Sequence, residues 1–200
     1  MYPIIGIVAL GGKSERMGTD KSMLQYHGKA QWLHVFNLLS KLCDTVVVSC
    51  NRTQMSNFPK EITVLIDAPE FENYGPIAAL LTAAKKYPEA SYLLVGCDYP
   101  FLMLDDLKLL LHNRNESVNG IAFYNEAAKL YEPLLAIYEQ PILYKLSANF
   151  ETGKVALQHF LSEISALKII PKNKDTIRSI DTKNDLLSAK EKLEKLNSKN

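Results

Sequence analysis

The stretch that decides the fold runs from residue 4 to residue 21 and reads IIGIVALGGKSERMGTDK. Its first part, Ile4–Leu10, is a continuous apolar run, which is typical of a strand that is buried on both faces of a sheet. The next two residues, Gly11 and Gly12, let the backbone come close to a ligand. Three basic residues follow in the same loop: Lys13, Arg16 and Lys21. Because such a loop can aim several N–H groups and positive charge at one anion, the stretch predicts a phosphate-binding turn after a buried strand.

The spacing of this loop excludes two common phosphate-binding motifs. A Walker A loop has four residues between its first glycine and Gly-Lys-Ser, but the glycine that precedes Gly11 and Gly12 here is Gly6, one residue too far away and inside the predicted strand. The loop also contains no Gly-x-Gly-x-x-Gly dinucleotide fingerprint. The alternative interpretation is a surface loop with ordinary solvated charges. The three basic residues directly after the first strand favour the phosphate site.

The rest of the chain alternates between apolar runs of strand length and helix-like stretches. The predicted strands are Ile4–Leu10, Thr45–Cys50, Ile62–Ile66, Tyr92–Gly96, Gly120–Tyr124 and Leu134–Tyr138. The predicted helices are Gln31–Leu42, Pro76–Lys86, Leu104–His112, Pro141–Phe150 and an amphipathic C-terminal helix from Asp185 that frays into a polar tail at about 196–200. This alternation predicts an α/β fold, a single Rossmann-like three-layer α/β/α domain over residues 1–200 with a mostly parallel sheet. In such sheets, ligands bind at the carboxyl ends of the strands, so the turns after Leu10, Cys50, Ile66 and Gly96 should hold the chemistry.

Composition narrows the class of protein. The chain has 200 residues, 47% of them hydrophobic and 22% charged, which is ordinary for a globular domain. A net charge of +1 gives no reason to expect nucleic acid or an anionic membrane as the partner, so phosphate recognition must come from a local site. The three cysteines lie in or beside apolar runs and are interpreted as buried free thiols in a reducing compartment. The apolar N-terminus lacks a basic leader and is interpreted as a strand, which makes the cytoplasm the expected location.

A carboxylate stands just beyond the strand Tyr92–Gly96. The sequence there continues Cys97-Asp98-Tyr99-Pro100, so Asp98 lies in a turn that Pro100 stiffens. Mg²⁺ typically takes one or two protein carboxylates and fills its other positions with phosphates and water. Asp98 is therefore a candidate metal ligand, and the alternative is a helix cap.

These segments resemble those of the molybdenum cofactor guanylyltransferase (MobA) family. The family's signature loop runs roughly Leu-Ala-Gly-Gly-x-Ser-x-Arg-Met-Gly-x-Asp-Lys, and residues 9–21 match it with the first two residues exchanged, Ala9 and Leu10. Asp98 matches the aspartate of the family's Cys-Asp-x-Pro motif. The resemblance extends from about residue 5 to about residue 186 and implies the nucleotide-diphospho-sugar transferase type of fold.

The resemblance also assigns the nucleotide site. It implies that Arg16, Lys21 and Asp98 are catalytic, with Asp98 on the metal. The residues that it implies for GTP binding are Ala9, Leu10, Gly11, Gly12, Lys21, Asn51, Asp67, Gly75, Pro76 and Asp98. Asn51 follows the second predicted strand, where a plain strand-ending turn is an equal alternative. Pro76 fits the first turn of a helix in any case. Trp32 and His34 lie in a further matching stretch, and we interpret both as packing residues.

Asp181 marks a departure from the family. Residues 179–182 read Ser-Ile-Asp-Thr, where the family pattern is Asn-x-Asn-Thr. A carboxylate carries full charge at neutral pH, unlike an amide, and would repel an anionic acceptor unless a cation lay between them. Two hypotheses follow: Asp181 helps Asp98 to hold the metal, or Asp181 caps the helix that follows.

The resemblance implies that GTP is the donor, that the phosphate of a molybdopterin-type molybdenum cofactor is the acceptor, and that Mg²⁺ is the cofactor. Pyrophosphate and the guanine dinucleotide form of the cofactor would be the products. A CTP-dependent cytidylyltransferase or another MobA-like transferase is the nearer alternative, and a nucleotide-binding module without turnover is the other. No nucleic acid or membrane partner is expected. A transient contact with proteins that handle the cofactor is an open expectation, and the oligomeric state, a monomer included, stays open.

Overall fold

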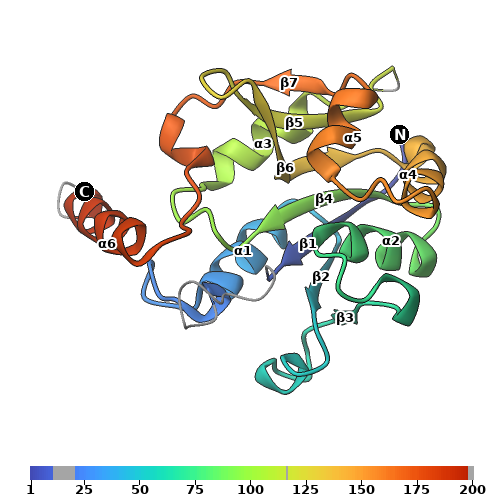
Figure 1. The fold of residues 1–200 in the computed structure, drawn as a ribbon. Helices are drawn as coiled ribbons and strands as arrows, with labels where there is room; N and C mark the ends of the chain where they lie inside the picture. Colours follow the sequence, from blue (N-terminus) through green and yellow to red (C-terminus); the bar gives the residue numbers. More distant parts are fainter. Residues whose placement is uncertain (11–20, 116, 198–200) are drawn as a thin grey trace.

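The computed structural model describes residues 1–10, 21–115 and 117–197, and in it the chain folds around one seven-stranded sheet (Figure 1). The strands lie in the order β3-β2-β1-β4-β6-β5-β7. Their bounds are β1 Ile4–Ala9, β2 Thr45–Cys50, β3 Val64–Ile66, β4 Ser91–Gly96, β5 Gly120–Asn125, β6 Leu130–Tyr138 and β7 Leu167–Ile169. The pairs β1–β2, β1–β4, β2–β3 and β5–β7 are parallel, whereas β6 runs antiparallel between β4 and β5. The predicted mostly parallel sheet is confirmed.

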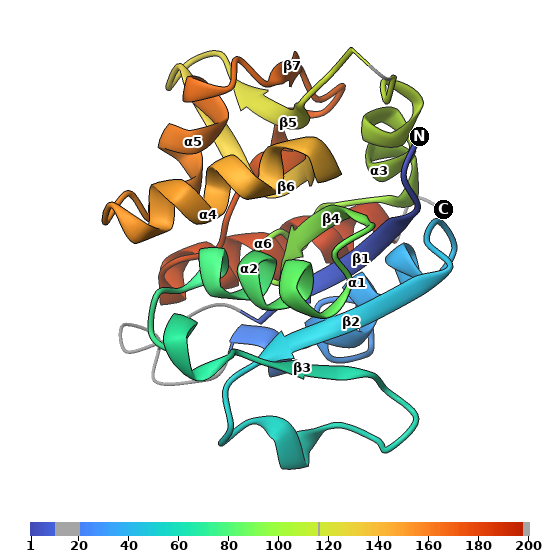
Figure 2. The same cartoon turned by 90° about the vertical axis from the view of Figure 1, so that its right-hand side faces the viewer.

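Helices cover both faces of the sheet (Figure 2). The helices of the described residues are α1 Gln31–Leu39, α2 Pro76–Lys86, α3 Leu104–His112, α4 Leu143–Glu151, α5 Leu157–Glu163 and α6 Lys183–Asn197. The first face is covered by α2, α4 and α5, and the other face by α1 and α3. The three-layer α/β architecture follows from strands that are apolar on both sides, because each face must be covered.

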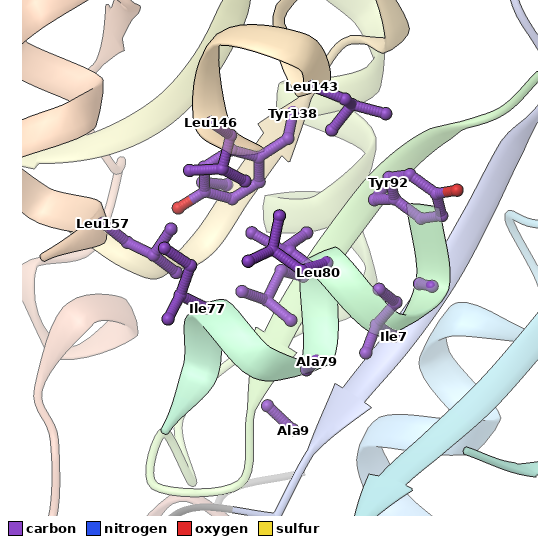
Figure 3. Close-up of a cluster of buried hydrophobic side chains, with 14 of the residues drawn as sticks. Ile7, Ala9, Ile77, Ala79, Leu80, Tyr92, Tyr138, Leu143, Leu146 and Leu157 are labelled. Atoms are coloured by element: carbon purple, nitrogen blue, oxygen red, sulfur yellow. The ribbon is translucent and has the colours of Figure 1, made fainter. Parts of the chain in front are cut away.

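One of the two main cores fills the space between the sheet and the helices α2, α4 and α5 (Figure 3). Tyr92 of β4 and Tyr138 of β6 lie fully buried in it, and Leu80 of α2 packs among them. Both phenol groups reach backbone carbonyls, since Tyr92 donates to Tyr87 at 2.5 Å and Tyr138 donates to Pro133 at 2.9 Å. A buried phenol without such a partner would cost free energy, so these bonds let large aromatic side chains serve as core.

The parallel strands bring four turns to one edge of the sheet. Strands β1, β2, β3 and β4 all end at this edge, as the sequence predicts for the turns after Leu10, Cys50, Ile66 and Gly96. The arrowheads of β1 and β4 point toward the side on which α6 lies (Figure 1). A small third core of Tyr26, Phe101, Ile180, Ala189 and Leu193 packs α6 against the residues that follow β4. The carboxyl edge of the sheet is therefore bordered by the C-terminal helix.

The structure corrects several predicted boundaries. The third strand begins at Val64 instead of Ile62, and β6 begins at Leu130, four residues earlier than predicted. The first helix ends at Leu39, and α4 begins at Leu143 after a short 3₁₀ turn. Two elements were not predicted: the strand β7, which has only three residues, and the helix α5, which has seven. Both are too short to show a clear hydrophobic period.

Two further features of the described residues are the state of the cysteines and the character of the helices. Cys43, Cys50 and Cys97 are buried and form no disulfide with one another, as predicted. Across the described parts of the chain, no helix combines the length and the apolar character that crossing a bilayer requires.

Candidate nucleotide and metal site

Asp98 lies two residues beyond β4, and one oxygen of its carboxyl group has no partner among the described residues. This oxygen, Oδ1, is buried and makes no hydrogen bond with the residues that the structure describes. A Cβ added to Gly96 would lie 2.5 Å from it, so only glycine leaves room for the carboxyl group at the end of its own strand. Burial raises the pKa of Asp98 to about 6, although the charge of Lys21 acts in the opposite direction. The alternative role as a helix cap is wrong, because α3 begins at Leu104 with Met103 at its N-cap.

The loop after Asp98 is held by side chains from residues 27–34. Three of them donate hydrogen bonds to its carbonyl oxygens: His27 Nε2 to Pro100 at 2.8 Å, Gln31 Nε2 to Tyr99 at 3.3 Å and His34 Nε2 to Leu102 at 3.4 Å. The two imidazole rings stack with their centroids 3.9 Å apart. Burial lowers the pKa of His34 to about 4, which keeps this ring neutral. The packing role expected for His34 is therefore joined by a second role, which is to fix the backbone beside Asp98.

Lys21 meets Asp181 across 160 residues of sequence. Lys21 Nζ donates to Asp181 Oδ1 at 2.7 Å, and Ser179 Oγ donates to Asp181 Oδ2 at 2.9 Å. The hydrogen bond from Lys21 is the main cause that holds the pKa of Asp181 below its ordinary value. The backbone N–H of Ile180 donates to the carbonyl of Asp98 at 2.9 Å, which ties this segment to the turn after β4. The structure thus gathers Lys21, Asp98 and Asp181 at one place.

The prediction that Asp181 caps the C-terminal helix is wrong. The next residue, Thr182, takes the cap position of α6, and its Oγ1 accepts a hydrogen bond from the N–H of Asp185 at 3.2 Å. Asp185 Oδ2 accepts in return from the N–H of Thr182 at 2.9 Å, which completes a capping box. The side chain of Asp181 is left to face Lys21. Its role as a second metal ligand stays a prediction.

The predicted nucleotide contacts Asp67, Gly75 and Pro76 lie between β3 and α2. Ser49 Oγ, on the neighbouring strand β2, donates to Asp67 Oδ1 at 3.4 Å, and burial raises the pKa of Asp67 to about 6. Gly75 has a φ of 68°, a conformation that glycine adopts without strain. Pro76 is the first residue of α2, where its missing N–H costs nothing. This turn follows β3, whose last residue, Ile66, pairs with the last residue of β2, Cys50.

Ala9 and Leu10, two further residues of the predicted site, make backbone hydrogen bonds to the neighbouring chain segments at the carboxyl edge of the sheet. The carbonyl of Ala9 accepts a hydrogen bond from the N–H of Cys97 at 3.1 Å, and the N–H of Leu10 donates to the carbonyl of Ser49 at 3.4 Å. The side chain of Leu10 is buried in the core on the α1 side. Their predicted contact with the base stays a prediction. Gly11, Gly12, Lys13 and Arg16 lie outside the described residues.

Asn51 is engaged in its own turn. Its Oδ1 accepts from Thr53 Oγ1 at 2.7 Å and from the N–H of Gln54 at 3.0 Å, and its backbone N–H donates to Gln54 Oε1 at 3.2 Å. The neighbouring Arg52 pairs with Glu72 at 3.1 Å. This geometry agrees with the alternative of a strand-ending turn.

Glu132 of β6 contacts the turn that holds Asp98, and it is not among the predicted site residues. The hydroxyl of Tyr99 donates to Glu132 Oε2 at 3.1 Å. Burial raises the pKa of Glu132, and the charge of Asp98 raises it further. The signal that could have found Glu132 is the resemblance of Glu132-Pro133-Leu134 to the family's His-Pro-Leu strand, with glutamate in place of histidine.

The residues at this place suit a single Mg²⁺. The buried oxygen of Asp98 lacks a partner, and Asp181 stands near enough for its charge to act on Asp98. No cluster of three or more histidine, cysteine or acidic side chains arranged for a metal occurs in the described residues. Mg²⁺ does not require one, because nucleotide phosphates and water complete its coordination.

The fold and this site define a class of protein. A mostly parallel α/β sheet that gathers a lysine and aspartates at the carboxyl ends of its strands is typical of nucleotidyltransferases. A structure of molybdopterin-guanine dinucleotide biosynthesis protein A from Archaeoglobus fulgidus superposes with a TM-score of 0.77 at 20% identity, over 96% of this chain and 99% of that one. The fold is therefore that of the nucleotide-diphospho-sugar transferases.

The chain belongs to the MobA-like NTP transferase domain family, which matches residues 6–167. A relative from Halalkalibacterium halodurans, named as a probable molybdenum cofactor guanylyltransferase, is 25% identical over 88% of this chain and 89% of its own length. A molybdenum cofactor biosynthesis bifunctional protein from Synechocystis is 27% identical over 92% of this chain. The match covers 52% of the length of that protein. The family resemblance seen in the sequence is confirmed.

Proposed function

We propose that this protein transfers GMP from GTP to the phosphate of a molybdopterin-type molybdenum cofactor and releases pyrophosphate. The observation that carries the proposal is the convergence of Lys21, Asp98 and Asp181 at the carboxyl edge of the sheet. Membership of the MobA-like family and the names of the two relatives support guanine as the base and the molybdenum cofactor as the acceptor. The three buried thiols agree with a reaction in the cytoplasm.

The transfer of GMP depends on orienting the two substrates and on positive charge near their phosphates, and it does not depend on a general base. An oxygen of the acceptor phosphate attacks the α-phosphorus of GTP in line, a new P–O bond forms, and the bond to the β-phosphate oxygen breaks. The attacking oxygen is already anionic, so no strong proton acceptor is required. Catalysis then depends on orienting two anions and offsetting their repulsion.

Lys21 would bind the triphosphate and stabilise the pyrophosphate as it leaves. In the structure its ammonium group contacts Asp181, so an incoming phosphate must replace that carboxylate. Asp181 therefore keeps Lys21 at the site until the nucleotide arrives. Asp67, Gly75 and Pro76 border the other side of the edge and would position the nucleoside.

Asp98 would hold Mg²⁺, with Asp181 as the second carboxylate once Lys21 has turned to the phosphates. The metal supplies charge that draws electron density away from the phosphoryl oxygens. The hydrogen bonds from His27, Gln31 and His34 keep the backbone around Asp98 fixed, so the carboxyl group does not have to reorganise.

The experiment that tests the proposal incubates the protein with each nucleoside triphosphate, Mg²⁺ and purified molybdenum cofactor while pyrophosphate is followed. We expect release with GTP only, and only when the acceptor is present. Release with CTP instead would establish the cytidylyltransferase. Binding of GTP without release would establish a nucleotide-binding module. Tyr144→Ala serves as a control for protein quality, because Tyr144 is 77% exposed on α4.

A further inference from the structure

The strand β6 is irregular where it passes the turn that holds Asp98. Between its pairs with Tyr124 and with Ala122, β6 advances by five residues while β5 advances by two, so β6 carries a bulge over residues 132–135. Pro133 lies in this bulge, where its missing N–H does not interrupt a ladder. Bulges bend a strand and re-aim its side chains, and they are over-represented beside active sites.

Two side chains of the bulge reach the turn after β4. The hydroxyl of Tyr99 donates to Glu132 Oε2 at 3.1 Å. A Cβ added to Gly96 would lie 3.0 Å from Leu134 Cδ1 and 2.5 Å from Asp98 Oδ1. Leu134 and the carboxyl group of Asp98 therefore border the same open side of Gly96. The bulge thus places one side chain against the metal-site carboxyl group and another on the residue that follows it.

The hydrogen-bond acceptor of Tyr99 differs from those of other buried tyrosines. Tyr92, Tyr131 and Tyr138 each donate to a backbone carbonyl, which satisfies the phenol within the core. Tyr99 donates to the carboxyl group of Glu132 instead. A hydrogen bond to a carboxylate is roughly twice as strong as one between neutral groups. Burial of the phenol alone would not require so strong a partner, so we attribute to this contact a role in holding Tyr99 in place.

Other contacts hold the same turn from different sides. Gln31 Nε2 donates to the carbonyl of Tyr99 at 3.3 Å, and the N–H of Ile180 donates to the carbonyl of Asp98 at 2.9 Å. Both act on the backbone, whereas Glu132 acts on the side chain of Tyr99. Asp98 Oδ1 has no partner of its own among the described residues, so its direction depends on how the neighbouring chain is held.

We propose that Glu132 is a positioning residue for the metal site. Through Tyr99, it holds Asp98 Oδ1 in the direction in which this oxygen binds a divalent cation. Glu132 is not assigned as a ligand, because no group of three or more acidic, histidine or cysteine side chains arranged for a metal occurs in the described residues. This inference rests on the metal site of the proposed function and adds the residue that orients its ligand.

The test uses Mn²⁺ as the probe, without nucleotide, and follows the loss of the electron paramagnetic resonance signal of the free ion. We expect wild-type protein to bind Mn²⁺, and Glu132→Ala and Tyr99→Phe each to weaken binding about tenfold, because each removes the same charge-assisted hydrogen bond. The double variant should bind no more weakly than either single variant. Glu132→Gln keeps an acceptor oxygen and should retain most of the affinity. The matched control is Tyr131→Phe, which removes the phenol hydrogen bond of the preceding residue to Ala166 and should leave Mn²⁺ binding unchanged.

Steady-state kinetics separate this inference from the proposed function. We expect Glu132→Ala to raise the Mg²⁺ concentration for half-maximal turnover about tenfold, while kcat at saturating Mg²⁺ stays near wild type. A purely structural role would lower the melting temperature without this shift in the Mg²⁺ requirement.

The positioning role is overturned if wild-type protein binds no Mn²⁺, if Glu132→Ala binds it as tightly as wild type, or if Tyr131→Phe weakens binding equally. If GTP supports turnover and Glu132→Ala leaves the Mg²⁺ requirement unchanged, the positioning role is wrong and the function stands. If Mn²⁺ binding depends on Glu132 although no nucleotide supports turnover, the function is wrong and the positioning role stands.

Discussion

The turn after β4 and the turn after β2 end at the same edge of the sheet, yet they use their polar residues in opposite ways. After β2, the side chain of Asn51 is exposed and satisfied by Thr53 and Gln54 of its own turn. After β4, Asp98 Oδ1 is buried without a described partner, while the backbone around it is fixed by residues from elsewhere in the chain. A polar residue at a strand end is available to a ligand only if its local turn leaves it unsatisfied. Leaving a buried polar atom without a hydrogen-bond partner costs free energy. An atom of this kind is therefore better evidence of function than a polar atom that its own turn satisfies.

The strongest test of this comparison is Asp98→Asn. The amide keeps the shape of the carboxyl group but loses the charge that would hold Mg²⁺, so we expect turnover to fall on the order of a thousand-fold. Pyrophosphate release measures the loss, and an unchanged melting temperature shows that the fold is intact. Wild-type turnover of this variant at ordinary Mg²⁺ concentrations would remove Asp98 from the metal site.

Lys21→Ala is expected to have the next largest effect. Losing a charge-assisted contact to the phosphates should weaken GTP binding by roughly ten- to a hundred-fold, as measured by titration calorimetry. Lys108→Ala is the control, because Lys108 forms its ion pair with Asp105 on α3. Lys13→Ala should cost less than Lys21→Ala, and the reverse order would show that the roles of the two lysines are exchanged.

Asp67→Asn should stabilise the protein, because its carboxyl group is half-buried and receives, among the described residues, only a long hydrogen bond from Ser49. The pKa of Asp67 is raised from 3.8 to about 6, so the folded state binds its proton more tightly than the unfolded state does. At pH 7 the wild type carries the cost of a half-buried charge, and because solvent screens that charge the variant should gain only ~1 kcal/mol in the free energy of unfolding.

The pH dependence gives the sign of this effect. As the pH falls through 6 toward 3.8, folded wild-type protein takes up the proton and regains stability, so the advantage of the variant should shrink and disappear below about pH 4. Urea unfolding at pH 7 and at pH 4 measures both values. A variant that is less stable than wild type at pH 7 would mean that the ionised carboxylate has a stabilising partner.

The smallest effect is expected from Asn51→Ala. If the side chain serves only its own turn, GTP affinity and turnover should stay within about twofold of wild type, and stability should fall by less than about 1 kcal/mol. Thr53→Ala removes one of the same turn bonds and is the matched control. A tenfold loss of GTP affinity in the Asn51 variant alone would restore its predicted contact with the nucleotide.

The sheet and the family could be predicted from the sequence because both leave local signals. Continuous apolar runs mark buried strands wherever they lie in the chain, and the glycine-rich loop is contiguous. The confirmed fold class, the buried cysteines and the family assignment all rest on such segments. The short elements β7 and α5 leave no period to detect, and the direction of β6 depends on its neighbours.

The site was harder to predict because its contacts are not local. The role of Glu132 depends on which strand lies beside β4, and no local pattern gives that order. The cap assignment for Asp181 failed for a related reason, since Thr182 and Asp185 satisfy the helix and release Asp181 to meet Lys21. The preference of aspartate for the N-cap position cannot identify the capping residue when a neighbouring threonine can also cap the helix.

The link from Ile180 to the turn after β4 ties the reaction centre to a segment outside the sheet. One backbone hydrogen bond, one ion pair and the small core beneath α6 hold residues 179–182 in place. Such a peripheral unit can open while the strands stay paired, because local opening costs less than global unfolding. The protein should therefore lose competence for its reaction at a lower temperature than it loses its sheet. In hydrogen exchange, the amide of Ile180 would exchange before those of β1 and β4.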